Sequence, residues 1–286
     1  MLLGILALLF TVAGQAGDPH QQGVALYQDK KYSEAVQVLE AAAKTEDPAS
    51  AAYKESVLLI GQSYFMLSQA PKAIPWLEHV PTVNEANYML GYAYLQTRQQ
   101  EQSRVAFARL FNLPPNSAAA HLLTGQMMLK KEYEDQASVE IAKALELDPK
   151  LPEAHFLLGE IALYRGQIDA AADDLRQELA LNPNFSMAWY RLGDANVRQE
   201  KWDAAIPNLQ RAIWLNPDFS GPYILLGKAY FKTANYSNAE GILRKALALD
   251  PHNASATYLL GQTLALEGKK DESKALLEHW KTLQRP

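Results

Sequence analysis

Apolar side chains recur at intervals of three and four residues along most of the chain. Residues 187–198, MAWYRLGDANVR, and residues 203–215, DAAIPNLQRAIWL, show this spacing clearly. Because an α-helix makes one turn in about 3.6 residues, the spacing gathers the apolar side chains on one helical face. Short polar stretches, several of them containing Asp-Pro or Asn-Pro, separate such segments. The pattern therefore predicts a chain of many amphipathic helices joined by short turns.

The predicted helices repeat with a fixed period, which glycine marks. Six glycines follow one another at intervals of 34 residues, and two earlier ones extend the series with unequal steps: Gly91, Gly125, Gly159, Gly193, Gly227 and Gly261, preceded by Gly23 and Gly61. Twelve positions after each glycine stands a small residue: Ala35, Ala73, Ser103, Ala137, Ala171, Ala205, Ala239 and Ser273. Sixteen positions after each glycine stands a large apolar residue: Leu39, Leu77, Phe107, Ile141, Leu175, Leu209, Leu243 and Leu277. This regularity predicts eight copies of one structural unit.

Each unit is predicted to be a hairpin of two helices. A glycine inside a helix costs about 1 kcal/mol relative to alanine, so its recurrence indicates that a second helix lies close against the backbone there. Proline follows the later glycines by 24 positions, as at Pro217 and Pro251, and ends the second helix. One hairpin cannot bury its apolar face alone, so neighbouring hairpins must stack. We expect an all-α solenoid.

The repeated residues resemble the signature of the tetratricopeptide repeat (TPR) family. Residues 189–217 match that signature at Trp189, Leu192, Gly193, Ala205, Leu209, Ala212 and Pro217, and residues 223–251 add Tyr230. The resemblance extends over about residues 16–286 and implies a TPR superhelix of about eight repeats. Residues 17–83 hold two irregular units, and residues 84–286 hold six regular ones.

Two departures from the repeat predict local irregularity. A long joint at residues 44–56 and an early end of the second helix at residues 79–85 predict a kink or irregular stacking between residues 45 and 85. Glu178 stands where the pattern places alanine. A buried, unpaired carboxylate is costly, so we expect its helix to rotate slightly and let Glu178 reach water.

The first sixteen residues predict export. Residues 1–13, MLLGILALLFTVA, are apolar apart from Thr11, and the small residues Gly14 and Ala16 fit a cleavage signal. We therefore expect residues 1–16 to be a signal peptide and the mature protein to be periplasmic or secreted. Two alternatives stay open. The run could be an uncleaved membrane anchor, although it is shorter than the about 20 residues of a bilayer span, or a buried helix of a cytosolic array.

Composition and motifs favour binding over chemistry. The net charge of −5 argues against general binding of nucleic acid, which needs a basic surface. The absence of cysteine excludes disulfides and thiolate metal sites. We find no phosphate-binding glycine loop and no metalloprotease motif, and we expect no enzyme activity and no cofactor. His121 and His155 lie 34 residues apart in equivalent slots, where we expect packing and not a metal site.

The resemblance also implies which residues face a partner. In TPR arrays the first helices line a concave groove, through positions shortly before and after each glycine. On this basis the candidate partner-binding residues are Tyr88, Tyr92, Phe156, Tyr164, Tyr190, Arg191, Asp194, Arg198, Lys228 and Lys232. Four of the last five are basic, so we expect this wall to grip an acidic or carboxylate-terminated segment of a partner protein.

These residues predict a protein–protein interaction scaffold, with a membrane-tethered assembly factor of the envelope or of pili as the alternative. The membrane would be a partner only if the N-terminal helix were retained. The last predicted helix, residues 271–286, carries four large apolar residues at its end of the array: Leu276, Leu277, Trp280 and Leu283. These four cannot all face inward, so we also expect weak self-association through this helix.

Overall fold

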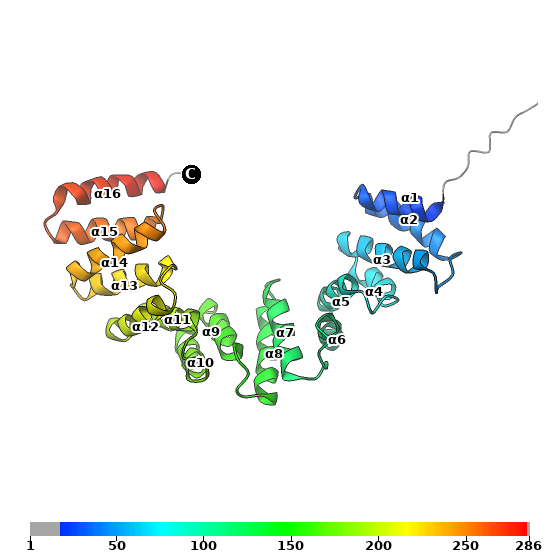
Figure 1. The fold of residues 1–286 in the computed structure, drawn as a ribbon, viewed down its shortest axis with the longest axis horizontal. Helices are drawn as coiled ribbons and strands as arrows, with labels where there is room; N and C mark the ends of the chain where they lie inside the picture. The colour runs from blue at the N-terminus through cyan, green and yellow to red at the C-terminus, as the bar shows by residue number, and fades with distance from the viewer. Residues whose placement is uncertain (1–17, 285–286) are drawn as a thin grey trace, which may run out of the picture. The chain divides into compact units, whose positions relative to one another are not determined.

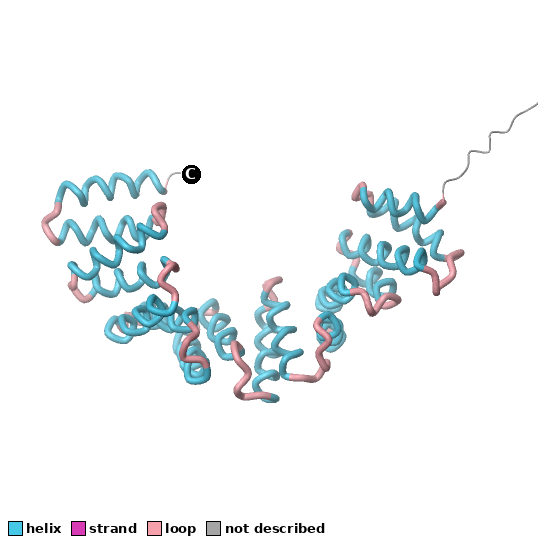
Figure 2. The backbone as a smooth tube through the Cα atoms, viewed as in Figure 1, coloured by secondary structure: helices cyan, strands magenta, loops and turns pink. Residues whose placement is uncertain are grey.

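A computed structural model describes residues 18–284 and contains sixteen α-helices and no strand within that range (Figures 1 and 2). The prediction of an all-α array of helix hairpins is confirmed. The predicted signal peptide, residues 1–16, lies outside the described residues. Over residues 18–284, no helix combines the length and the apolar character that a bilayer span requires. The helices are α1 (Pro19–Gln28), α2 (Tyr32–Ala43), α3 (Ala51–Met66), α4 (Ala70–Leu77), α5 (Asn84–Gln96), α6 (Gln100–Leu110), α7 (Ala118–Leu129), α8 (Glu134–Leu147), α9 (Ala154–Tyr164), α10 (Ile168–Leu181), α11 (Ser186–Arg198), α12 (Trp202–Leu215), α13 (Ser220–Lys232), α14 (Tyr236–Leu249), α15 (Ala254–Leu266) and α16 (Lys270–Leu283).

The chain divides into two compact units, which are described separately. Unit 1 ends at Thr124 and contains the hairpins α1–α2, α3–α4 and α5–α6. Unit 2 begins at Gly125 and contains the hairpins α9–α10, α11–α12, α13–α14 and α15–α16. The division falls within α7 (Figure 1). The separation of irregular residues 17–83 from regular residues 84–286 rests on the sequence and stays a prediction.

One contact closes every hairpin: the periodic glycine lies against the large apolar residue sixteen positions later. A Cβ atom at Gly227 would lie 2.5 Å from both Cγ and Cδ2 of Leu243, and one at Gly193 would lie 2.5 Å from Cδ2 of Leu209. All eight periodic glycines lack room for a methyl group in the same way. The small residues twelve positions after glycine are all at most 4% exposed. The predicted close approach of the two helices is confirmed.

A Schellman turn ends the first helix of each hairpin. In α13, the amide of Asn235 donates to the carbonyl of Tyr230 at 2.8 Å, and Ala234 between them has φ 57°. The left-handed residue always stands seven positions after the periodic glycine: Lys30, Ser68, Arg98, Glu132, Gly166, Glu200, Ala234 and Gly268. Only two of the eight are glycine, the residue that this conformation favours. The turn therefore forms at the same position of every repeat even where the left-handed residue is not glycine.

The second helices end where the sequence predicts. In the regular repeats α8, α10, α12 and α14 each stop two residues before a proline, at Leu147, Leu181, Leu215 and Leu249. Helix lengths differ most near the predicted irregularity, where α3 has 16 residues and α4 has 8. Pro75 lies inside α4 and removes one backbone donor there.

Neighbouring hairpins of unit 2 stack through two sets of contacts, the more extensive one between each second helix and the first helix of the next hairpin. In unit 2, α9, α11, α13 and α15 contact one another in succession, and each second helix contacts the first helix of the next hairpin. Among the described helices of this unit, no two second helices approach one another to the same extent. The first helices therefore form the inner face of unit 2, and the second helices form its outer face.

Tyrosine hydroxyls add polar links between successive hairpins. The hydroxyl of Tyr64 in α3 donates to Oε1 of Glu40 in α2 at 2.7 Å. In unit 2, Nε2 of Gln210 in α12 donates to the hydroxyl of Tyr230 in α13 at 2.9 Å. Tyr94 makes the equivalent contact in α5. Burial and then the hydrogen bond to Glu40 raise the pKa of Tyr64 to about 12, so this donor stays protonated at neutral pH.

Glu178 in α10 is fully buried, so the expectation that its helix rotates to expose it is wrong. Its carboxylate accepts hydrogen bonds from the amides of Glu153 at 3.1 Å and Phe156 at 3.4 Å. Both amides belong to the first turn of α9, where the helix dipole favours a negative charge. Glu153 has φ 69°, so the chain enters α9 through a left-handed residue. Backbone amides at the start of α9, in the same hairpin, thus replace the water that we expected.

The two glycines of the hairpin α13–α14 provide a test of the closing contact. Gly227→Ala places a methyl group against Leu243, and we expect it to lower the free energy of unfolding by about 1–3 kcal/mol through overpacking. Gly241→Ala in α14 meets nothing within 4 Å, and we expect it to raise that free energy by up to about 1 kcal/mol through helix propensity. Urea unfolding of both variants measures the difference. Equal effects would show that the glycine contact does not set the packing.

Candidate partner-binding surface

The inner face of unit 2 carries an exposed tyrosine beside a small hollow. Tyr164, the last residue of α9, is 79% exposed, more than any other large apolar or aromatic side chain among the described residues. The hollow has a volume of about 300 Å³ and is lined by Glu160, Leu163, Tyr164, Arg191 and Arg198. It lies between the first helices α9 and α11. The structure therefore brings Tyr164, Arg191 and Arg198 together, as the sequence predicted.

Both arginines of this hollow take part in ion pairs. Nε of Arg191 donates to Oε1 of Glu160 across the α9–α11 contact at 2.6 Å. Nη2 of Arg198 lies 2.9 Å from Oδ2 of Asp194, one turn earlier in α11. Nη1 of Arg198 donates to the carbonyl of Leu163 at 3.3 Å, near the end of α9. Both guanidinium groups are thus held by carboxylates while keeping further N–H donors.

The pairing changes the charge that the sequence predicted for this wall. We expected four cations against one carboxylate, Asp194. The structure adds Glu160, so Arg191 and Arg198 each have an anionic partner within 3 Å. The wall is therefore electrically balanced at α9 and α11 and is not basic there.

Positive charge remains one hairpin further along the same face. Lys228 is half-buried and Lys232 is exposed, and both stand on α13 four residues apart. Among the described residues, neither lysine takes part in an ion pair. Like charges at this spacing destabilise a helix slightly, so the fold gains nothing from placing a second lysine, Lys228, one turn before Lys232.

Two aromatic residues predicted for this face have mainly packing roles. Phe156 is 8% exposed and packs against Phe185 with ring centroids 4.7 Å apart, so little of its ring is open to a partner. Tyr190 is half-buried, with an edge contact to Phe219 at 5.0 Å and the guanidinium of Arg191 at 5.3 Å from its ring centroid. Burial raises the pKa of Tyr190, and Arg191 partly offsets that effect. Partner contact by Tyr190 stays a prediction.

The predicted pair Tyr88 and Tyr92 lies on α5 in unit 1. Tyr88 is 39% exposed and is available to a partner. Tyr92 is 3% exposed and lies against Phe107, with ring centroids 5.1 Å apart. It therefore supports Tyr88, whose ring lies 5.0 Å away, and does not itself reach the surface. The sequence pattern could not separate the two, because both follow the same helical spacing.

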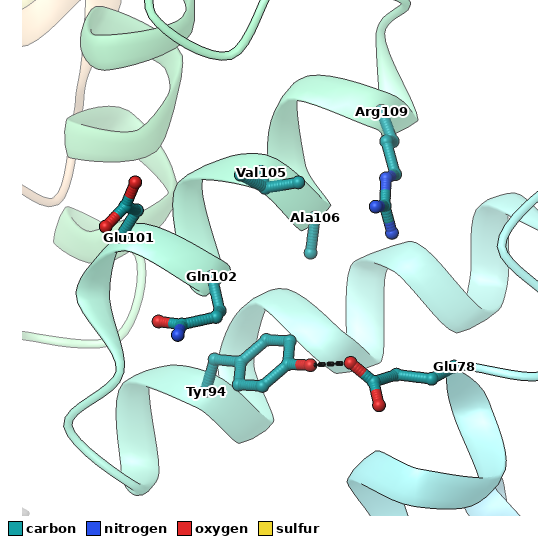
Figure 3. Close-up of a pocket in the computed structure, with 7 residues that line it drawn as sticks. All are labelled: Glu78, Tyr94, Glu101, Gln102, Val105, Ala106 and Arg109. Carbon is teal, nitrogen blue, oxygen red and sulfur yellow. Dashed lines mark hydrogen bonds between the residues drawn. The ribbon is translucent and has the colours of Figure 1, made fainter.

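A second hollow, of about 360 Å³, lies in unit 1 between α5 and α6 near the end of α4 (Figure 3). Within it the hydroxyl of Tyr94 donates to Oε1 of Glu78, and Arg109 extends into the hollow from the end of α6 (Figure 3). Burial, followed by this hydrogen bond, raises the pKa of Tyr94. The tyrosine–carboxylate pair is the same link between hairpins as that of Tyr64. We therefore interpret this hollow as part of the stacking contact.

Among the described residues, no histidine belongs to a cluster of potential metal ligands. Nδ1 of His155 lies 3.2 Å from Oδ1 of Asp174, and burial is the main cause that raises the pKa of that carboxyl group. His121 is buried. Over residues 18–284, no group of three or more His, Asp or Glu side chains converges as metal ligands would.

The last helix is better covered than the sequence suggested. Trp280 packs on Tyr258 with ring centroids 4.7 Å apart, and Leu277 contacts the backbone at Gly261. Leu276 packs against the adjoining core cluster, and all four apolar residues of α16 are partly buried. The largest exposed apolar side chain nearby is Leu266, the last residue of α15, at 57%. Less apolar surface is left for self-association than we expected.

Sequence reasoning missed two residues of the inner face. Glu160 stands one position after its periodic glycine, as the candidate residue Asp194 does, and it pairs with Arg191, which lies 31 residues later on the next first helix. Leu266 stands five positions after its periodic glycine, as Tyr164, Arg198 and Lys232 do. The signal that could have found Glu160 is opposite charge on successive first helices, one position after one periodic glycine and two positions before the next.

Sequence comparison gives the family. Three profiles described as tetratricopeptide repeat match residues 85–117, 156–218 and 234–284, which together make up about half of the chain. The chain is a tetratricopeptide repeat protein. No curated protein matches this TPR protein in sequence.

Solved structures share the TPR fold of this chain. A crystal structure of MamA is 27% identical, with a TM-score of 0.53, and the match covers 56% of this chain and 94% of MamA. YrrB, described as a TPR protein with an unusual peptide-binding site, is 22% identical with a TM-score of 0.57 over 63% of this chain and 92% of its own. PilF of Pseudomonas aeruginosa is 20% identical with a TM-score of 0.57 over 70% and 91%. The last two comparisons show likeness of fold alone.

Proposed function

We propose that this TPR protein is a non-catalytic scaffold that binds a segment of a partner protein on the inner face of unit 2. The observation that carries the proposal is Tyr164, which stands 79% exposed beside a hollow that Arg191 and Arg198 line. Tyrosine and arginine are the residue types that contribute most to protein interfaces. An exposed tyrosine adds nothing to the packing of a hairpin, so binding is the better explanation of its position. YrrB shares the fold and has a peptide-binding site, which supports the proposal that this fold binds a peptide segment.

The hollow favours an extended peptide over a folded surface. The carboxylates of Glu160 and Asp194 accept hydrogen bonds, and the guanidinium groups of Arg191 and Arg198 donate them. A peptide backbone offers both donors and acceptors along its length. Since the charges of the hollow are balanced, a neutral backbone can enter it without leaving a buried charge unpaired.

We also propose that the protein is exported, on the evidence of residues 1–16 alone. Their apolar run and the small residues at Gly14 and Ala16 fit a cleaved signal peptide. A membrane-tethered assembly factor of the envelope or of pili, with this run retained, is the second candidate. Both candidates place the inner face of unit 2 outside the cytoplasm, and they differ in the N-terminus of the mature protein.

The partner-binding proposal is tested with two exposed aromatic residues of unit 2. Tyr164→Ala on the inner face should weaken partner binding about 30-fold, since an interface hot spot contributes about 2 kcal/mol or more. Trp214→Ala on the outer face, where Trp214 is 69% exposed, is the matched control and should leave binding unchanged. Recovery of the native partner by the tagged variants, quantified against the unsubstituted protein, gives the result. Loss of recovery with Trp214→Ala alone would place the interface on the outer face.

The export proposal is tested by N-terminal sequencing of the protein from its native host. We expect the mature chain to begin near Gly17, because a signal peptidase cleaves after a small residue such as Ala16. Met1 retained in a membrane fraction would identify an anchor instead, and Met1 retained in the cytosol would contradict export.

Weak self-association through α16 stays a proposal, with a smaller apolar surface than the sequence implied. We expect the sedimentation coefficient of the native protein to rise with concentration and that of Trp280→Asp to stay constant. Lys281→Asp, which changes an exposed charge one residue away, serves as the control for charge itself. Identical behaviour of native protein and Trp280→Asp at all concentrations would exclude this interface.

A further inference from the structure

Four exposed side chains form one row along the inner face of unit 2. Each is the last residue of a first helix and stands five positions after a periodic glycine: Tyr164, Arg198, Lys232 and Leu266. Tyr164 and Leu266 are 79% and 57% exposed, the side chain of Arg198 is 47% exposed, and Lys232 is exposed. Because the helices that carry them contact in succession, the row follows the stacking direction of the hairpins.

The row is aromatic, cationic, cationic and aliphatic in that order, and the needs of the fold account for only part of it. A cation at a helix C-terminus interacts favourably with the helix dipole, which explains a basic residue at Arg198 or Lys232. It does not explain Lys228 one turn before Lys232, because the two like charges repel. It also does not explain two large apolar side chains that stand in water at both ends of the row.

We infer that the partner segment is extended, with two acidic residues at its centre and an apolar residue at each end. This inference rests on the proposed function and adds the sequence class of the bound segment. Packed helices lie about 10 Å apart, and an extended chain advances about 3.3 Å per residue, so one hairpin corresponds to about three residues. The segment that reaches from Tyr164 to Leu266 is therefore about ten residues long.

The two acidic positions of the segment are not equivalent. At α11 the guanidinium of Arg198 already pairs with Asp194, so a partner carboxylate shares this cation. At α13 neither Lys228 nor Lys232 has an ion-pair partner among the described residues, so a carboxylate there meets two unshared cations. The acidic residue opposite α13 consequently contributes more to binding. The apolar ends of the segment cover Tyr164 and Leu266 and remove their surfaces from water.

The test uses a synthetic probe, the capped peptide Leu-Gly-Ser-Asp-Gly-Ser-Asp-Gly-Ser-Leu with a fluorescent label. Its pattern is the same in both chain directions, so it fits whichever way the segment runs. Fluorescence anisotropy with the mature protein should give saturable binding that weakens as salt increases, because the lysines lie in water. A peptide with Lys in place of both Asp residues should bind at least tenfold more weakly. One with Ser in place of both Leu residues should also bind more weakly.

Protein variants then locate the contacts. Lys232→Gln should weaken binding of the probe about three- to fivefold, and Lys245→Gln, an exposed lysine of the second helix α14, should leave it unchanged. Leu266→Ser should weaken binding and abolish the preference for a terminal Leu at one end of the probe. Circular dichroism of each variant checks that the fold is intact.

Two results would overturn the inference: no saturable binding of the acidic probe, or equal binding of the acidic and basic probes. Loss of binding with Lys245→Gln equal to that with Lys232→Gln would overturn it as well. These failures concern the class of segment only. The proposed function would still stand if Tyr164→Ala lost the native partner while Trp214→Ala kept it, and it would fail separately if it did not.

Discussion

The contact between a glycine backbone and one large apolar side chain sixteen residues later sets the geometry of this protein. At Gly227 and Leu243, as in every repeat, that contact leaves no room for a methyl group. It fixes both the distance and the rotation of the two helices in a hairpin, because the apolar side chain can enter only where the Cβ is missing. The turn, the stacking of hairpins and the identity of the inner face all follow from this rotation.

The candidate surface is a product of stacking and not of any single repeat. Glu160 belongs to one hairpin and Arg191 to the next, and their ion pair exists only because α9 and α11 lie side by side. The hollow beside Tyr164 has the same origin, since residues of both helices line it. The surface therefore needs at least two correctly stacked repeats.

The period of the sequence was enough to predict the hairpins, because glycine, small residue, large residue and proline each have one structural reason to recur. Side-chain environments on the inner face could be predicted only in part. Phe156 stands at the same repeat position as Tyr88, which is 39% exposed, and a small rotation of the helix decides whether such a ring is buried. Glu178 was misjudged for a different reason. Its carboxylate oxygens accept hydrogen bonds from two backbone amides at the start of α9. A sequence does not show which backbone amides are available as donors.

The left-handed residue that ends each first helix has a consequence for how this chain can change. Six of these eight turns are occupied by residues with a side chain, such as Lys30, Glu200 and Ala234, although glycine would adopt the conformation at less cost. The backbone pattern is thus retained without the residue best suited to it. At each such turn, substitution by glycine would raise the free energy of unfolding. Such a substitution could offset a destabilising change on the inner face, so that the array still folds.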